Sequence, residues 1–415
     1  MFDRPSQGNE KKESESNGFQ SRAPVPSLPK GGGAIRGIGE KFTANPVTGT
    51  GSMTVPIATS PGRSGFGPQL SLSYDSGAGN GPFGLGWNLS LPSITRKTDK
   101  GLPEYFDAQE SDVFILSGVE DLVPELLPGG SRFEDKTTDP TYTIHRYRPR
   151  IEGLFARIER WTRNADGDVH WRSISKDNIL TLYGKDDNSR VAAPDDPTRV
   201  FSWLICETRD DKGNAVVYEY KSEDGADVDL VQVHERNRED RNSPLRKVNR
   251  YLKRIHYGNR TSLLDNAGHR PRVLTQADIN NADWMFEVVF DYAEGHYQAL
   301  PTDAQGREHV TASTGESNDW PVRTDPFSSY RAGFQVRTYR LCRRVLMFHH
   351  FPLELGVADC LVRSTEFTYD EKPIASFISG VTQSGYVRQG TRYLRIVSAA
   401  TRVRIQPGRH RPGDP

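Results

Sequence analysis

The chain has 415 residues, with 54 Lys or Arg and 54 Asp or Glu, so its formal net charge is zero. This balance argues against a protein that mainly coats nucleic acid or an anionic membrane, because such proteins carry a basic excess. No apolar stretch approaches the ~18 residues of a membrane-spanning helix. The N-terminal sequence has no apolar core of a secretory signal, so we expect any export to follow a route other than Sec.

The first predicted segment is a disordered arm over residues 1–30. This stretch is polar and then proline-rich, with Pro24, Pro26 and Pro29 in quick succession. Such a composition buries too little apolar surface to offset the entropy lost on folding.

Glycine punctuates the next segment, residues 31–87, in which short apolar runs alternate with turns. Apolar side chains recur at every second position, as Met53, Val55 and Ile57 and again as Leu70, Leu72 and Tyr74. This period of two is typical of strands, and glycine supplies the positive φ that tight hairpins need. The segment therefore predicts antiparallel hairpins.

The same pattern continues to about residue 387, which predicts a mainly β domain over 31–387 built from antiparallel hairpins. Asp166-Gly167 lies between two strand-like runs and is typical of a type I′ hairpin turn. Helical signals are few, and only 226–240 and 274–284 leave a short helix open. The polar stretch 298–327 predicts an irregular surface excursion.

The residues from 388 to 415 predict a divergent basic tail that is disordered. They contain one acidic residue, Asp414, and no apolar pattern near their end. The tail carries seven arginines, at positions 388, 392, 395, 402, 404, 409 and 411. A basic tail of this kind can bind an acidic partner, but an unstructured end is the simpler interpretation.

The chain matches known catalytic and phosphate-binding motifs only in part. The GxGxG at Gly77, Gly79 and Gly81 leads into Pro82 and a strand, not into a helix that could bind a pyrophosphate. No GK[ST] or GxSxG is present. The three cysteines lie within apolar runs, which favours buried, inert thiols: Cys206, Cys342 and Cys360.

Partial metal motifs fail in a similar way. His234-Glu235 begins an HExxH zinc motif, but Arg238 stands where the second histidine is needed. His349 and His350 are adjacent, so on a strand they face opposite sides. The Asp-rich turns lack the bidentate glutamate of a calcium loop. We therefore expect no metal, no cofactor and no catalytic residue.

Two sets of residues leave an interaction surface open. One is a basic stripe with an aromatic member, for which a solvated sheet face is the simpler interpretation: Arg337, Tyr339, Arg340, Arg343 and Arg344. The other is a set of tryptophans that could form an exposed platform for a carbohydrate or a receptor: Trp161, Trp171 and Trp320.

Long and unusual runs resemble the SpvB family, which covers the Salmonella virulence plasmid B protein and the B components of insecticidal toxin complexes. The resemblance begins in the glycine-rich run LPKGGGAIRGIGEKF and continues through ESDVFILSGVEDLVPEL, WMFEVVFDY and DPFSSYRAGFQVRTYRLCRRVLMFHHF. It covers about residues 27–387.

The resemblance implies a non-enzymatic part in a toxin complex. The B component, joined to a C component, is similar to an RHS-repeat shell that encloses a toxic domain and passes it to a pore-forming A component. This chain would then supply the first strands of the shell, as a virulence factor secreted without a Sec signal. Its partners would be the A and C components or the remainder of the B component.

The family's enzymatic activity is not expected here. The plasmid protein carries an ADP-ribosyltransferase that needs an ExE pair and an STS motif. The only ExE is Glu13-Ser14-Glu15 in the predicted arm, and no STS occurs. From about Gln389 the chain departs from the family, which raises the hypothesis of a fragment or pseudogene product. An autonomous carbohydrate- or receptor-binding domain is the alternative.

Overall fold

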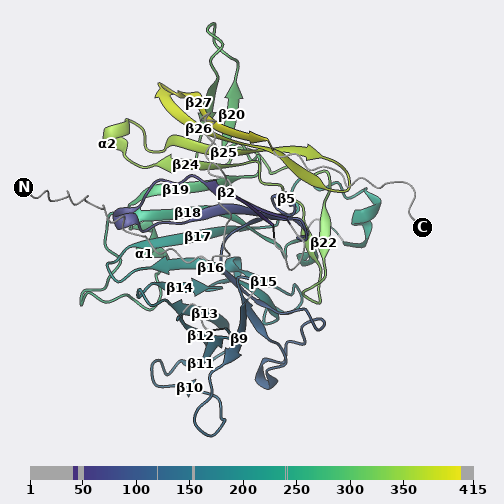
Figure 1. The fold of residues 1–415 in the computed structure, drawn as a ribbon, viewed down its shortest axis with the longest axis vertical. Helices are drawn as coiled ribbons and strands as arrows, with labels where there is room; N and C mark the ends of the chain where they lie inside the picture. The colour runs from purple at the N-terminus through teal and green to yellow at the C-terminus, as the bar shows by residue number, and fades with distance from the viewer. Residues whose placement is uncertain are drawn as a thin grey trace, which may run out of the picture. The chain divides into compact units, whose positions relative to one another are not determined.

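The computed structural model describes residues 41–44, 51–118, 120–151, 155–238, 240 and 242–402. These residues all belong to one compact unit, Arg36–Pro415. The expected arm, 1–30, lies outside the described residues. The described chain is mainly β with few short helices, which confirms the predicted fold class (Figure 1).

The glycine-rich segment forms a four-stranded antiparallel sheet, as its period of two predicts. Val55 and Leu72 lie opposite each other on neighbouring strands, and both are fully buried. The alternation therefore marks the face that packs on the core. The strands are β1 (Lys41–Ala44), β2 (Gly51–Ile57), β3 (Leu70–Asp75) and β6 (Trp87–Leu89).

Eight strands of the large sheet form a closed ring of antiparallel pairs. Each strand pairs with the next, and the last pairs back with the first. In ring order they are β7 (Ser93–Arg96), β8 (Phe114–Leu116), β9 (Glu120–Pro124), β11 (Tyr142–Pro149), β12 (Arg157–Arg163), β13 (Val169–Ile174), β14 (Leu180–Tyr183) and β16 (Val200–Arg209).

Aromatic side chains fill the ring. The Trp171 ring centroid lies 4.9 Å from those of Phe114 and Tyr147 and 6.0 Å from that of Trp203. Trp171 lies on β13 and Phe114 on β8, which are not paired strands, so this contact crosses the interior. All four side chains are buried, and aromatic packing of this kind contributes beyond the area that it buries.

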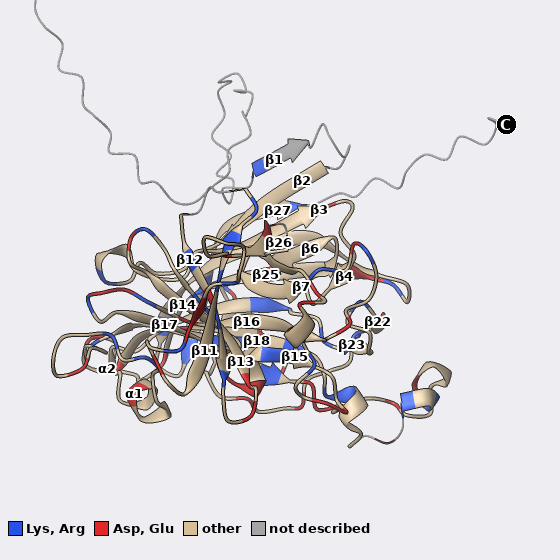
Figure 2. Cartoon of the chain, turned by 90° about the horizontal axis from the view of Figure 1, so that it is seen from below, with Lys and Arg blue, Asp and Glu red and all other residues tan. Residues whose placement is uncertain are grey.

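From β16 the sheet continues as a long antiparallel ladder (Figure 1). Its strands are β17 (Ala215–Ser222), β18 (Arg250–Asn259), β19 (Trp284–Asp291), β24 (Arg344–His349), β25 (Cys360–Glu371), β26 (Ser376–Gln389) and β27 (Arg392–Arg402). A hairpin of β20 (Tyr297–Leu300) and β21 (His309–Ala312) pairs with the start of β27. Acidic and basic residues are interspersed over the strands and loops (Figure 2), in keeping with the balanced charge.

The remaining elements within the described residues are short. Six are strands: β4 (Asn80–Gly81), β5 (Gly84–Leu85), β10 (Glu134–Asp135), β15 (Arg190–Ala192), β22 (Phe327–Ser329) and β23 (Val336–Thr338). Seven are helical: α1 (Gln276–Asn280), α2 (Pro352–Leu355), and the 3-10 turns η1 (Arg63–Gly65), η2 (Asp107–Gln109), η3 (Asp187–Ser189), η4 (Val233–Arg238) and η5 (Pro244–Arg246). In the part of the chain described, no helix has the length and apolar character needed to span a membrane.

Both segments that left a helix open contain a short one. In 274–284, Thr275 and Asp278 cap α1 reciprocally through side chain and backbone. In 226–240 only the 3-10 turn η4 forms.

The N-terminal sheet packs on the ladder through side-chain and backbone contacts. The Tyr257 hydroxyl donates to the carbonyl of Ser60 at 2.6 Å, and Gln383 Nε2 donates to the carbonyl of Pro56 at 2.9 Å. Gly84, at φ 85°, lies so close to β26 that a Cβ would stand 2.6 Å from the Ser376 carbonyl oxygen. Glycine is therefore required there by both backbone conformation and space.

The Asp166-Gly167 hairpin forms between β12 and β13, but its turn differs from the expected type I′. Only Gly167 has a positive φ, 76°, and its amide donates to the carbonyl of Arg163. A type I′ turn needs positive φ at both central residues. The connection is therefore a longer loop with one left-handed glycine.

Two expected irregular segments are more ordered than predicted. The 298–327 stretch contains β21 and the fully buried Trp320, so it is not a simple surface excursion. β27 shows that the expectation of a disordered tail from residue 388 is wrong as far as Arg402, because Tyr393 packs into a buried cluster. The tail from residue 403 lies outside the described residues.

Candidate functional site

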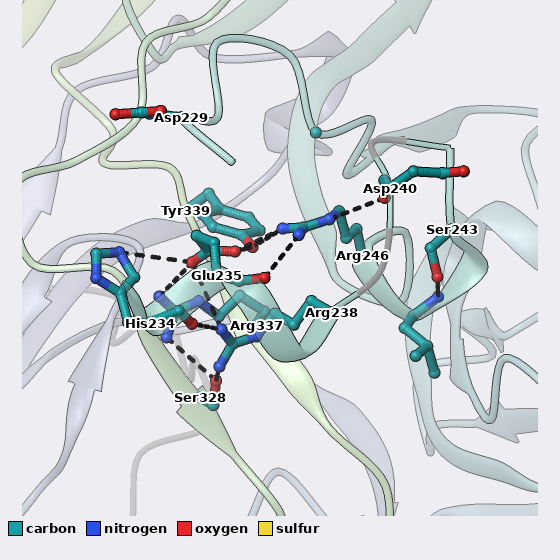
Figure 3. Close-up of polar contacts among 12 residues, drawn as sticks. Asp229, His234, Glu235, Arg238, Asp240, Ser243, Arg246, Ser328, Arg337 and Tyr339 are labelled. Carbon is teal, nitrogen blue, oxygen red and sulfur yellow. Dashed lines mark hydrogen bonds and ion pairs between the residues drawn. The ribbon is translucent and has the colours of Figure 1, made fainter. Parts of the chain in front are cut away.

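The partial zinc motif is built into a buried cluster around Glu235 (Figure 3). Glu235 lies in η4 and is 2% exposed. Its carboxylate accepts hydrogen bonds from Arg246 Nη1 at 2.5 Å, Arg337 Nη2 at 2.8 Å and the Tyr339 hydroxyl at 2.5 Å. The cluster thus joins η4 and η5 to the β22–β23 hairpin, about a hundred residues away in sequence.

The electrostatics of this cluster keep Glu235 ionised. Burial raises the pKa of Glu235, but hydrogen bonds from Tyr339 and Arg246 and the charge of Arg337 outweigh it, so this pKa is lower than usual. Burial, and next the adjacent carboxylate, raise the pKa of Tyr339 to about 12. The phenol therefore stays protonated and donates to the carboxylate.

This arrangement does not suit a metal ion. Arg238 Nη1 lies 3.6 Å from Glu235 Oε1, on the side where a zinc motif would place a histidine. His234 Nε2 is also 3.6 Å from the same oxygen. A carboxylate surrounded by guanidinium groups has its lone pairs engaged, and a cation would meet repulsion there. These guanidinium groups therefore disfavour a zinc ion at Glu235.

A second buried arginine, Arg340, anchors the same part of the chain. Its guanidinium pairs with both oxygens of Glu223, and both side chains are fully buried. It also donates to the carbonyl oxygens of Trp320 at 2.5 Å and Ala226 at 2.9 Å. The Arg340 guanidinium lies 4.4 Å from the Trp320 ring centroid, a cation–π distance.

A third cluster surrounds Asp325. Arg323 makes two parallel hydrogen bonds to its carboxylate, at 2.7 and 2.8 Å, and donates to the Gly81 carbonyl at 2.8 Å. Ser376 donates to Asp325 through both its amide and its hydroxyl. Burial raises the pKa of Asp325, but these bonds outweigh it and the pKa is lowered.

These clusters correct the sequence interpretation of the basic stripe. Arg337, Tyr339 and Arg340 are buried, so they do not belong to a solvated sheet face. Arg343 and Arg344 fit that interpretation better, since their side chains are 25% and 22% exposed. Residues 320–340 are thus held by the buried carboxylates of Glu223 and Glu235, and by the bonds that Ser376 donates to Asp325 within the segment.

Among the residues that the structure describes, one group has the composition of a metal site: Glu294, His296 and Glu316 offer ligand atoms within 4.8 Å of one another. The Lys253 ammonium lies among them, 2.7 Å from both Glu294 Oε1 and His296 Nε2. A fixed ammonium thus stands where a metal ion would, and we assign the group a structural role.

The adjacent histidines separate as strand alternation requires. His349 Nε2 lies 2.6 Å from Ser60 Oγ, whereas His350 faces a surface cleft of about 670 Å³. In the cleft wall, His350 lies between two carboxylates, 3.0 Å from Asp359 and 3.1 Å from Glu287. Burial lowers the pKa of His350, but these two carboxylates outweigh it and raise the pKa to about 9.

The His350 bridge predicts a loss of stability at alkaline pH. Because the folded-state pKa is about 9 and the unfolded value is about 6.5, the stabilisation is complete below pH 6.5 and is lost as pH rises through 9. Urea unfolding at pH 6 and pH 9 should show a decrease that is larger by on the order of 2 kcal/mol in the unaltered chain than in His350→Gln. Equal decreases in both proteins would contradict this role of His350.

The three cysteines are buried and unpaired, as the sequence predicts. Burial raises the pKa of Cys206 to about 12, so little thiolate is available for reaction. The native protein should therefore resist a thiol reagent such as DTNB, and all three thiols should react once guanidinium unfolds it. Rapid labelling of any of them in the native protein would show that the apolar packing around it opens.

The tryptophan platform is contradicted by burial. Trp161, Trp171 and Trp320 are 2%, 0% and 0% exposed. Trp171 lies inside the ring of strands, and Trp320 packs on Tyr251 at 5.3 Å between ring centroids. These side chains are unavailable to a carbohydrate or a receptor. The proposed binding residues of the alternative, a carbohydrate- or receptor-binding domain, are therefore not exposed.

The ladder ends at β27, whose outer edge is partly open. No local sequence motif predicts this open edge. β27 pairs with β26 along its whole length, whereas β21 contacts only the start of β27, at Tyr393 and Leu394. Among the described residues, no strand pairs with the second edge of β27 from Ile396 to Arg402. Ile396 and Val397 are each 51% exposed there. An open edge with exposed β-branched residues favours pairing with a further strand.

Known proteins share both the sequence and the fold of this chain. The family described as Salmonella virulence plasmid 65kDa B protein matches residues 45–351. The mono(ADP-ribosyl)transferase SpvB of Salmonella choleraesuis strain SC-B67 is 38% identical over 387 residues, which cover 91% of this chain and 60% of the relative. The chain thus spans well under two thirds of the length of that protein.

Two solved structures extend the comparison. The N-terminal domain of effector protein SpvB from Salmonella typhimurium strain LT2 superposes with a TM-score of 0.65 at 37% identity, covering 80% of this chain and 98% of that domain. TcdB2–TccC3 superposes with a TM-score of 0.69 at 32% identity, covering 90% of this chain and 17% of that protein. The resemblance found in the sequence is confirmed, and the chain belongs to the SpvB family.

Proposed function

We propose that this chain is a non-enzymatic structural module of a toxin complex. It contributes continuous sheet to a shell that encloses a toxic effector and delivers it. The similarity to TcdB2–TccC3 over 90% of this chain supports this assignment, since the aligned region is a small part of that larger protein. A Photorhabdus luminescens Tc holotoxin pore structure is similar over 89% of this chain.

The open edge of β27 is the observation that carries the proposal. A ladder of antiparallel strands that ends with exposed Ile396 and Val397 is suited to receive the next strand of a larger sheet. The ring of strands fills its own interior with aromatic side chains, so it offers no such junction. We therefore infer that the shell continues from β27.

Partners and location follow from the same proposal. The partners are the pore-forming A component, the C component and the remainder of the B component. Delivery is extracellular. The relatives are effector and toxin proteins, which supports an extracellular destination.

The non-enzymatic part of the proposal is tested by NAD+ consumption. The transferase activity named for the Salmonella relatives belongs to proteins of which this chain spans 60%. The purified chain should leave NAD+ intact, with the complete Salmonella SpvB as positive control. Turnover of NAD+ above the buffer rate would contradict the proposal.

The structural role is tested by a chimera. Residues 45–402 of this chain would replace the matching region of TcdB2 in TcdB2–TccC3. We expect a closed shell in electron micrographs and an enclosed TccC3 C-terminal region that resists added protease. TcdB2 lacking the region is the negative control. A soluble, folded chimera that leaves the C-terminal region open to protease would contradict the proposal.

A further inference from the structure

Three side-chain donors converge on the hydroxyl oxygen of Ser328, beside the Glu235 cluster, and Figure 3 shows two of them, Arg238 and Arg337. Ser328 Oγ receives hydrogen bonds from Gln335 Nε2 at 2.6 Å, Arg337 Nη1 at 3.2 Å and Arg238 Nη2 at 3.4 Å. A hydroxyl oxygen has two lone pairs, so it cannot satisfy three N–H donors fully. The two longer distances reflect this shared, incomplete acceptance.

The positive charge of the arginines next to Ser328 is also only partly balanced. Arg238 and Arg337 both lie against one carboxylate, that of Glu235. Among the described side chains, the Nε atoms of Arg238 and Arg337 are buried and have no hydrogen-bond partner. Two guanidinium groups that share one carboxylate carry an excess of positive charge, so Arg238 and Arg337 favour an added anion.

The site reaches the surface at Ser328. Ser328 and Gln335 are partly exposed, and the Arg238 side chain is 12% exposed. η4 supplies Arg238, while Arg337 lies directly opposite Ser328 on the paired strand. The donors thus come from two elements that other bonds already hold in place, which lowers the entropy lost on binding.

We propose that Arg238, Arg337 and Gln335 form a binding site for a phosphate group at Ser328. A phosphate group brings negative charge to the two guanidinium groups that share the Glu235 carboxylate, and its several oxygens accept donors from different directions. The ligand class is therefore inorganic phosphate or a phosphate-bearing small molecule. This binding site is independent of the shell function and stands whether or not that function holds.

The direct test is calorimetric titration of the purified full chain with inorganic phosphate, with chloride at equal ionic strength as reference. We expect saturable binding that is weakened about tenfold or more in Arg238→Gln. Arg163→Gln is the matched control, because Arg163 is 42% exposed and pairs with Asp166 away from this site. Unsaturable heats, or equal affinity in Arg238→Gln, would overturn the proposal.

A second pair of variants keeps the test decisive if Arg238→Gln fails to fold. Ser328→Glu supplies a tethered anion, and Ser328→Gln has a similar size without the charge. We expect Ser328→Glu to melt above Ser328→Gln, with a difference that shrinks in high salt, and to lose the phosphate response. An equal or lower melting temperature for Ser328→Glu would show that the cluster does not accept an anion.

Separate arms distinguish the two sources of the phosphate group. Inorganic phosphate alone should saturate the site if the free ion is the ligand. A higher affinity for a phosphate monoester such as glycerol phosphate, again lost in Arg238→Gln, would identify a phosphate-bearing small molecule. Binding of neither probe would refute the site.

Discussion

Arg340→Ala is expected to destabilise the protein by about 3–5 kcal/mol, because it leaves the Glu223 carboxylate buried without a partner. Both side chains are fully buried, and Arg340 also supports the carbonyl oxygens of Trp320 and Ala226. Three regions that are distant in sequence therefore lose a common anchor. Guanidinium unfolding followed by circular dichroism measures the change.

Arg343→Ala is the matched control for this prediction. Arg343 lies three residues further on and also pairs with a carboxylate, Glu371, but both side chains are about a quarter exposed. A pair of this kind contributes about 1 kcal/mol or less. Similar losses for Arg340→Ala and Arg343→Ala would contradict the buried role assigned to Arg340.

Trp171→Ala is expected to cost about 3–5 kcal/mol, since it empties the centre of the ring of strands. Trp171 is fully buried and contacts Phe114, Tyr147 and Trp203. The cavity would lie among strands that close on themselves and have little freedom to collapse. A lower guanidinium midpoint and altered near-ultraviolet dichroism are the expected observations.

Phe106→Ala provides the comparison for this core substitution. Phe106 is a large aromatic residue of the same part of the chain, but it is 58% exposed. Its replacement should change stability by about 0.5 kcal/mol or less. A Trp171→Ala variant as stable as Phe106→Ala would show that the ring of strands is not packed as described.

The local structure could be predicted from the sequence because its signals are local. Val55 and Leu72 alternate with polar residues and occupy the buried face of their strands. The Asp166-Gly167 pair marks a hairpin, even though the turn is longer than the two-residue type. Residues a few positions apart determine such features, so one sequence suffices.

The closure of the ring could not be predicted in this way. β16 pairs with β7, and the hydroxyls of Ser202 and Thr95 lie 2.9 Å apart across 107 residues of sequence. Nothing in either strand identifies the other as its partner. The register between distant strands depends on the whole core, which residue patterns do not describe.

The burial of the arginines cannot be predicted from the sequence for a related reason. A charged residue in a strand is normally solvated, and the local sequence around Arg340 predicts a solvated side chain. Its partner, Glu223, lies 117 residues earlier, and Arg337 binds Glu235 across 102 residues. Only the fold brings each carboxylate to its guanidinium. A sequence signal exists only in retrospect, as the abundance of Arg over Lys, since Arg suits buried bidentate pairs.

We propose that β27 is the edge from which a larger sheet continues, and hydrogen exchange tests this role most directly. Some backbone amides of residues 396–402 in β27 do not donate hydrogen bonds to β26. These amides should exchange rapidly in the chain alone and become protected in the TcdB2 chimera. Protection of these amides in the isolated monomer, or rapid exchange in an assembled chimera, would contradict the claim.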